Sequence, residues 1–208
     1  MDQEEYAMKR YAVLAGWLIL GLTAFTAKAE DQTGAVARIS AAIDSSAAPD
    51  KLKAFAKTTL LPLTTNAVLI KETKAQNEKN MPDAEIQKID KDWQAAEDEL
   101  PIQKEKLSNA VAEELKKFAA AHPSVIEVFA MDNKGGVVGE NKLTSDYWQG
   151  DEEKWTGSYA GGKGGVDVGK LKFDKSANAN LQQISLPLIA EDGSIVGAIT
   201  FGVAVEKL

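Results

Sequence analysis

The sequence of 208 residues contains no cysteine. Disulfide bonds, thiolate metal sites, covalently attached c-type haem and lipid attachment through a cysteine are therefore excluded. Histidine occurs once, as His122. A zinc site with two histidines cannot form, and a Ser-His-Asp set would need this one residue. Because His122 ends a predicted helix and precedes a proline, we expect it to cap free helix carbonyls.

Arginine is almost as scarce, since only Arg10 and Arg38 occur. The formal net charge is −7, and no run of basic residues follows position 30. A nucleic-acid surface needs clustered Lys and Arg to neutralise phosphates, so nucleic acid is excluded as a partner. Apolar residues make up 44% and charged residues 26% of the chain, which is typical of a globular protein.

The amino-terminal segment has the pattern of an export signal. Lys9-Arg10 precedes the uncharged stretch Ala12–Ala27, and Ala27-Lys28-Ala29 offers small residues for cleavage. A membrane span needs about 20 apolar residues, and this stretch is shorter, although an uncleaved anchor is an alternative. Acidic residues precede the basic pair, so Met8 rather than Met1 is an alternative start. We predict a signal peptide over residues 1–29, cleaved near Ala29, and a periplasmic or secreted mature chain.

Residues 30–122 carry a helical pattern. Ala, Lys, Glu and Gln dominate, and Gly34 is the single glycine of this stretch. We predict helices that begin at Asp50, Ala67, Pro82-Asp83 and Pro101, with Pro62 just beyond the end of the first. The last helix, Pro101–Ala121, carries one apolar stripe: Leu107, Val111, Leu115 and Phe118.

After Pro123 the pattern changes to that of β-structure. Strands are predicted over residues 125–131, 137–138, 165–173, 184–189 and 195–205. Asp132–Gly136 and Glu191–Ser194 are predicted to be hairpin turns. Five strands with such links predict an antiparallel sheet, covered on one face by the Pro101–Ala121 helix. The fold class is therefore α+β, with a helical region over residues 30–100 in front of a domain over residues 101–208.

A near-match to a phosphate loop occurs at Gly157–Lys163. Gly164 replaces the Ser or Thr that would bind magnesium, and a strand rather than a helix follows. We therefore interpret this segment as a glycine-rich hairpin or lid. Carboxylates are plentiful, and a calcium ion would have Asp146, Asp151, Glu152 and Asp174 as candidate ligands. Since no calcium-loop motif is present, we predict no metal and no cofactor.

The segment Thr144–Trp155 concentrates aromatic and charged residues (TSDYWQGDEEKW) between two predicted strands. If it forms a helical turn or two, Trp148, Asp151, Glu152 and Trp155 share one face. Indole rings around a carboxylate suit a cationic or amphipathic ligand. The alternative is that the rings only fill the core while the acids solvate the loop.

Several segments of residues 101–208 resemble the Cache (PDC-type) extracytoplasmic sensor domains, closely a periplasmic group of single-Cache proteins. The similar segments are Ile126–Gly135, Thr144–Glu152 with Lys154-Trp155, Phe173-Asp174-x-Ser176, Gln183–Pro187 and Asp192–Ile199. Lys74–Asn77 and Ile89–Trp93 are also similar to what precedes the domain in that group.

This resemblance implies a PAS-like fold, in which a long amino-terminal helix packs on a five-stranded antiparallel sheet. It places the ligand between the sheet and the loop joining its second and third strands, here Asn141–Gly165. On this basis the expected ligand-binding residues are Tyr147, Trp148, Asp151, Trp155 and Asp174. Dicarboxylate-binding relatives use basic clamps. Since Lys154, Lys163 and Lys170 are the available cations here, an amine-bearing or polar ligand is expected.

Two functions follow as hypotheses. The first is an exported small-molecule-binding sensor that signals through a separate membrane receptor or acts as a free binding protein. The second is a structural or interaction module whose helical region docks on a partner or forms a homodimer, without a small ligand. The chain offers no nucleophile–base pair, so we expect no enzymatic activity.

Overall fold

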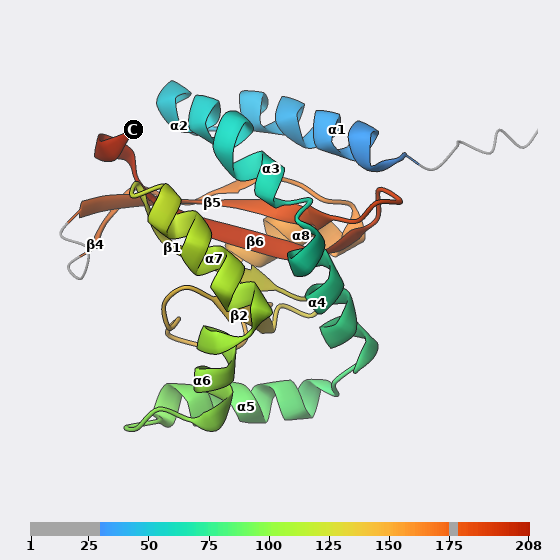
Figure 1. The fold of residues 1–208 in the computed structure, drawn as a ribbon, viewed down its shortest axis with the longest axis vertical. Coiled ribbons are helices and arrows are strands. Elements are labelled where there is room, and N and C mark those ends of the chain that lie inside the picture. Colours follow the sequence, from blue (N-terminus) through green and yellow to red (C-terminus); the bar gives the residue numbers. More distant parts are fainter. Residues whose placement is uncertain (1–29, 175–178) are drawn as a thin grey trace, which may run out of the picture.

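The computed structural model describes residues 30–174 and 179–208, apart from the side chain of Asp174. The predicted signal peptide, residues 1–29, lies outside these residues. Among the described helices, none is long and apolar enough to cross a membrane. The molecule consists of an antiparallel sheet with helices on both of its faces and one helix, α5, set apart at the end (Figure 1).

The helical region contains five α-helices: α1 (Gln32–Ser45), α2 (Asp50–Phe55), α3 (Leu61–Leu63), α4 (Ala67–Glu78) and α5 (Asp83–Ala95). The side chains of Asp31 and Asn66 cap α1 and α4 by accepting backbone N–H groups of the first turn. A proline precedes the first residue of α2 and of α5. The predicted starts at Asp50, Ala67 and Asp83 are confirmed.

The sequence predicts Pro62 just beyond the end of a helix, but the structure places it inside α3. A π-helical turn, η1 (Ala56–Leu60), joins α2 to α3, and the N–H of Leu61 donates to the carbonyl of Ala56. The α-helical bonding pattern is therefore already shifted where the proline enters, so its missing N–H and its ring are accommodated. The positions of the prolines in the sequence do not by themselves reveal such a π-helical turn.

The predicted helix Pro101–Ala121 is divided into α6 (Pro101–Ser108) and α7 (Ala110–Ala121). Asn109 lies between them in an extended conformation, and its side chain accepts the N–H of Ala112 at 2.9 Å. Its amide also donates to the carbonyl of Val138 at 2.8 Å. The break thus anchors the start of α7 to the sheet.

The sheet contains β1 (Val125–Met131), β2 (Val137–Glu140), β3 (Asp167–Val168), β4 (Lys172–Asp174), β5 (Ala179–Ile189) and β6 (Ile195–Ala204). Its order is β2-β1-β6-β5-β3, with β4 also paired to β5, and the pairs are antiparallel. The predicted strand over 165–173 is thus one edge strand in two pieces. The sheet has the predicted five positions, and both predicted hairpin turns are present.

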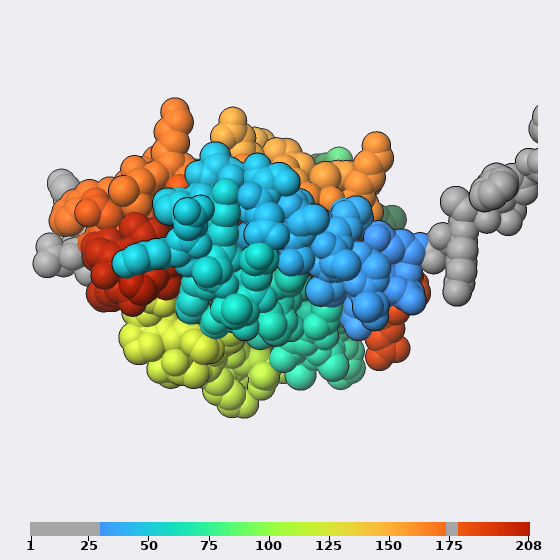
Figure 2. All heavy atoms as spheres, turned by 90° about the horizontal axis from the view of Figure 1, so that it is seen from above, coloured from blue at the N-terminus to red at the C-terminus, as the bar shows by residue number. Residues whose placement is uncertain are grey.

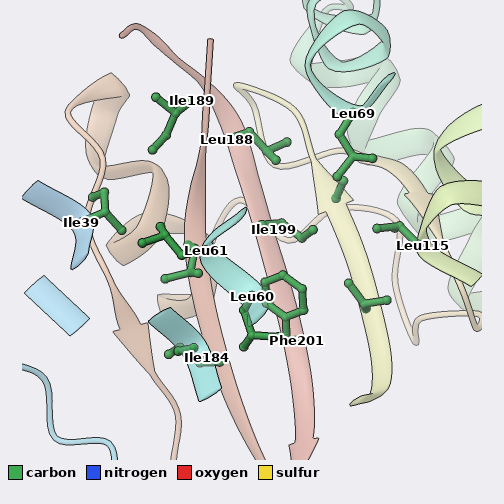
Figure 3. Close-up of a cluster of buried hydrophobic side chains, with 14 of the residues drawn as sticks. Ile39, Leu60, Leu61, Leu69, Leu115, Ile184, Leu188, Ile189, Ile199 and Phe201 are labelled. Atoms are coloured by element: carbon green, nitrogen blue, oxygen red, sulfur yellow. The ribbon is translucent and has the colours of Figure 1, made fainter. Parts of the chain in front are cut away.

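The two faces of the sheet differ in composition. Ile184, Leu188, Ile199 and Phe201 point to the helical face, where they pack against α1, α3, α4 and α7 (Figure 3). Helices α1 to α3 form the outer surface there, and the carboxyl-terminal residues lie beside α2 (Figure 2). The opposite face carries α8 (Glu153–Tyr159) and the 3₁₀ turn η2 (Ala160–Gly162), which belong to the connection between β2 and β3. We call it the α8 face.

Candidate functional site

The site is built on the turn between β1 and β2. One carboxylate oxygen of Asp132 accepts the N–H groups of Lys134 and Gly136 at 2.8 and 2.9 Å, which closes the turn. Gly135 has a φ of +85°, and a Cβ on it would lie 2.5 Å from the backbone of Gly150. The turn therefore allows a second backbone segment to approach it directly.

That second segment is the aromatic part of the β2–β3 connection. The N–H of Val137 donates to Tyr147 O at 3.0 Å, and that of Gln149 to Gly135 O at 2.9 Å. The indole N–H of Trp148 donates to Lys134 O at 2.8 Å, and that of Trp155 to Asp132 O at 2.9 Å. Both indole N–H groups are thus used to hold the loop on the turn.

Helices α4 and α5 contact the same turn and loop through side-chain hydrogen bonds. A carboxylate oxygen of Asp90 accepts the backbone N–H of Trp148 at 2.9 Å, and the indole of Trp93 donates to Thr144 O at 3.0 Å. Gln76 Nε2 donates to Asp132 Oδ2 at 2.8 Å, and Asn77 Oδ1 accepts the N–H of Asn133. These four helical residues lie in the segments Lys74–Asn77 and Ile89–Trp93.

Sequence reasoning noted those two segments but assigned them no role. Polar residues on the buried face of an amphipathic helix could have indicated this role, because buried polar groups need hydrogen-bond partners. Gln76 and Asp90 are both buried. Their partners in the turn and the loop, Asp132 and Trp148, however, lie 56 and 58 residues away in the chain.

Trp148 and Trp155 line one cleft, but not through a shared helical face. Trp148 forms an isolated β-bridge with Gly136, and α8 begins only at Glu153. The cleft has a volume of about 450 Å³. Besides the two indoles it is lined by Asp83, Ile86 and Gln87 of α5, by Asn133 and Lys134 of the turn, and by Gly150. We call it the indole cleft; the carboxylate near its rings is Asp83, not Asp151.

On the α8 face, aromatic side chains of α8 cover part of the sheet. Trp155 and Tyr159 stack with ring centroids 5.1 Å apart and pack against Phe129, Met131 and Ala198. Lys154 Nζ lies 5.4 Å from the ring centroid of Phe129, 2.9 Å from Gln149 Oε1 and 3.0 Å from Glu152. This part of the face is closed.

The rest of the α8 face is polar. Ser185 and Thr200 are fully buried and share a hydrogen bond of 2.8 Å, and Gln183 donates to Glu127 at 2.8 Å. Two overlapping hollows of about 320 and 510 Å³ open beside Gln183, and the smaller one is also lined by Glu127. Their lining includes Glu127, Asp151, Glu152, Lys154, Asp167, Lys170, Lys172 and Gln183. We call these hollows together the charged groove.

The acids of the groove lie among cations of the same groove. Burial, and then the charge of Glu153, raises the pKa of Asp167, whereas Lys154 and a backbone hydrogen bond lower it. Within the described residues, no group of three or more acidic or histidine side chains is placed to hold a metal ion.

The structure separates the five expected ligand-binding residues. Tyr147 is only 2% exposed and packs against Trp93, with ring centroids 5.8 Å apart, so it supports the loop from within. Trp148 and Trp155 line the indole cleft, and Asp151 lines the charged groove. The backbone of Asp174 pairs with Ala179, and its side chain lies outside the described residues.

His122 occupies the predicted position at the end of α7, where its backbone N–H donates to Phe118 O and Ala119 O. Its ring packs against Phe118 at 4.6 Å and Phe55 at 6.2 Å between centroids. The backbone N–H of His122, rather than the imidazole predicted to do so, caps the helix carbonyls, and the ring contributes an aromatic contact.

No family model and no curated protein matches the sequence. Similar solved structures include the sensor domain of the V. cholerae histidine kinase DctB (13% identity, TM-score 0.45, covering 84% of this chain and 55% of that one). Another is the ligand-binding domain of the Campylobacter jejuni chemoreceptor Tlp3 with 4-methylisoleucine (19%, TM-score 0.37, covering 74% and 63%). A third is that of the Pseudomonas aeruginosa PAO1 amino acid chemoreceptor PctC with GABA (11%, TM-score 0.32, covering 65% and 56%).

All three neighbours are sensor or ligand-binding domains of histidine kinases and chemoreceptors. This chain spans about 55–63% of their lengths. The likeness is distant, and the fold is defined by this chain's own helices, strand order and register.

Proposed function

We propose that this chain is an exported small-molecule-binding protein of the Cache sensor type, and that its ligand occupies the charged groove. The observation that carries the proposal is the polar α8 face of the sheet. A sheet covered on both sides is usually apolar on both, because unsatisfied buried polar groups cost free energy. Here Glu127 and Gln183 line hollows that the β2–β3 connection leaves open. Ser185 and Thr200 form a buried polar pair on the same face.

The charges of the groove define the ligand that suits it. Glu127 and Asp167 offer carboxylates, and Lys170 and Lys172 offer ammonium groups. A small polar molecule that bears an amine and an anionic group would meet a partner at each end. Lys154 is engaged by Gln149 and Glu152, so its role is to position the loop.

The expected ligand-binding residues take different roles in this proposal. Asp151 stands at the groove and Asp174 follows Lys172 in β4, so both remain ligand candidates. Tyr147 positions the loop between the turn and α5, while Trp155 positions α8 over the sheet. Trp148 lines the separate indole cleft.

The function proposed is binding without catalysis. The one histidine is packed against two phenylalanine rings, which leaves it poorly placed as a general base. The ligand signal would pass to a separate receptor in the membrane, or the protein would act as a free binding protein. The hydrophobic stretch Ala12–Ala27 supports export, and mass spectrometry of the mature amino terminus would test cleavage near Ala29.

The proposal is tested by calorimetric titration of the purified protein with amino acids, amines and organic acids. We expect a ligand bearing both charges to bind saturably, and Lys170→Ala with Lys172→Ala to weaken it at least tenfold. Lys163→Ala is the matched control, since Lys163 is exposed and does not line the groove.

Two outcomes would contradict the proposal. One is that no compound in these classes binds. The other is that the doubly substituted protein binds as tightly as the wild type. The interaction module without a small ligand would then remain, and analytical ultracentrifugation would test its predicted homodimer.

A further inference from the structure

The indole cleft is separate from the charged groove. Helix α8 contributes Trp155 to the cleft and Lys154 to the groove, and no side chain lines both. The cleft is formed by three segments distant in sequence: α5, the β1–β2 turn and the residues from Trp148 to Trp155. A ligand there would contact both the helical region and the hairpin.

The aromatic surface of the cleft is apolar. The N–H groups of Trp148 and Trp155 donate to the carbonyls of Lys134 and Asp132, so neither indole has a donor left for a ligand. Ile86, which is almost fully buried, adds aliphatic surface beside the rings. A bound molecule would therefore meet the rings with an apolar face.

The charges of the cleft compensate each other. Lys134 Nζ lies 3.2 Å from Asp83 Oδ1 and 2.9 Å from Met81 O. An ammonium ligand would meet this resident cation, and a carboxylate ligand would compete with Asp83. The remaining polar side chains, Gln87 and Asn133, carry amides that both donate and accept hydrogen bonds. The lining is therefore suited to an uncharged molecule.

We propose that the indole cleft is a second binding site, for an uncharged ring-shaped ligand with an apolar face and a hydrogen-bonding edge. A pyranose sugar is the simplest molecule of this class, since its C–H groups and its hydroxyl groups can meet the rings and the amides together. The volume of about 450 Å³ is sufficient for one or two such rings. The proposal is independent of the ligand in the charged groove.

The test is a titration of intrinsic tryptophan fluorescence with glucose, N-acetylglucosamine and cellobiose, beside choline and acetate as charged probes. Two of the four tryptophans of the chain line the cleft, so occupancy changes the emission. We expect a saturable change with at least one sugar and none with the charged probes.

Variants assign the response to the cleft. Gln87→Ala with Asn133→Ala removes the amide groups without touching the core and should weaken sugar binding at least tenfold. Lys91→Ala, on the exposed side of α5, and Lys170→Ala with Lys172→Ala, in the charged groove, should leave it unchanged. The proposal is overturned if no sugar gives a saturable response, if choline or acetate binds instead, or if the amide variant binds sugar like the wild type.

Discussion

At the scale of single residues, Glu140 is a buried acid with a raised pKa. Its side chain is fully buried at the end of β2. One carboxylate oxygen accepts the N–H of Thr144 at 2.9 Å, while the other has no partner among the described residues. Burial raises the pKa of Glu140 to about 7, against the opposing effects of Thr144 and Lys106.

A pH-dependent stability follows from this residue. Below about pH 4.5, Glu140 is protonated in both folded and unfolded chains. Between there and about pH 7 only the unfolded chain ionises it, so rising pH lowers the free energy of unfolding. The loss is on the order of 3 kcal/mol. The Glu140→Gln variant should not show this loss of stability with rising pH. Urea unfolding at pH 5 and pH 8 would measure it.

In that experiment the stability difference between Glu140→Gln and the wild type should grow with pH, in favour of the variant. Parallel stability profiles for the two proteins would contradict the assignment. Lys106→Met is a useful second variant, because removing that charge should raise the pKa of Glu140 further.

Single residues also show how far the sequence could predict the site. The cluster of aromatics and acids in Thr144–Trp155 predicted a loop whose residues line the indole cleft and the charged groove. It did not distinguish Tyr147, which fills the core, from Trp148 and Trp155, which line a cleft. That distinction depends on Trp93 and Asp83, which come from another helix and whose position no local pattern gives.

At the scale of elements, helix α5 holds the aromatic loop through Asp90. Asp90→Ala would leave the N–H of Trp148 without its acceptor and should destabilise the protein by about 1–3 kcal/mol. Asp92→Ala is the matched control on the same helix. Among the described residues Asp92 pairs with exposed Lys88, so its loss should leave stability nearly unchanged.

Hydrogen exchange of residues 144–150 provides a second readout for this variant pair. Asp90→Ala should accelerate exchange at Trp148, and Asp90→Asn, which keeps an acceptor oxygen, should restore protection. Equal exchange in all three proteins would show that Asp90 does not hold the loop.

The break between α6 and α7 gives a further prediction. Asn109→Ala removes the cap of α7 and the bond to Val138, and should cost about 1–2 kcal/mol of stability. Ser108→Ala, one residue earlier and exposed, should be nearly neutral. Thermal unfolding of both variants would measure the difference; equal melting temperatures would contradict this role of Asn109.

Elements with a strong local pattern were predicted correctly from the sequence, including β1, the two hairpin turns, α4 and the start of α5. The failures lie where tertiary contacts override local signals. Pro62 is tolerated inside a helix because of a π-turn, and Asn109 divides a helix because Val138 binds it. The edge strand is interrupted between Val168 and Lys172, where the apolar positions change phase from Val166 and Val168 to Leu171 and Phe173.

At the scale of the whole molecule, the buried side chains form one large cluster and several small ones. The large cluster joins α1 to α4 and α7 to the sheet. Helix α5 belongs to a small cluster in which Ile86 and Trp93 meet Val137 and Tyr147. The sequence predicted a sheet covered by a helix, but not that helices from residues 30–78 share its core, because strand order and helix docking are not encoded locally.

This division predicts two levels of stability. Native-state hydrogen exchange should show amides of α5 opening at a lower free energy than those of β5 and β6, whose opening should require global unfolding. Exchange of α5 and β6 at the same free energy would mean that the small cluster is no weaker than the large one.

The close approach of Gly135 and Gly150 also limits which residues these two positions can accept during evolution. A methyl group on Gly150 would lie 2.3 Å from Trp148 Nε1, and one on Gly135 would lie 2.5 Å from Gly150. The same methyl group on Gly150 would also lie 2.7 Å from the carbonyl oxygen of Lys134, which is backbone and cannot be replaced. In a selection for folded revertants, smaller residues at position 148 alone should therefore not rescue Gly150→Ala, so position 150 should stay glycine whatever residue stands at 148.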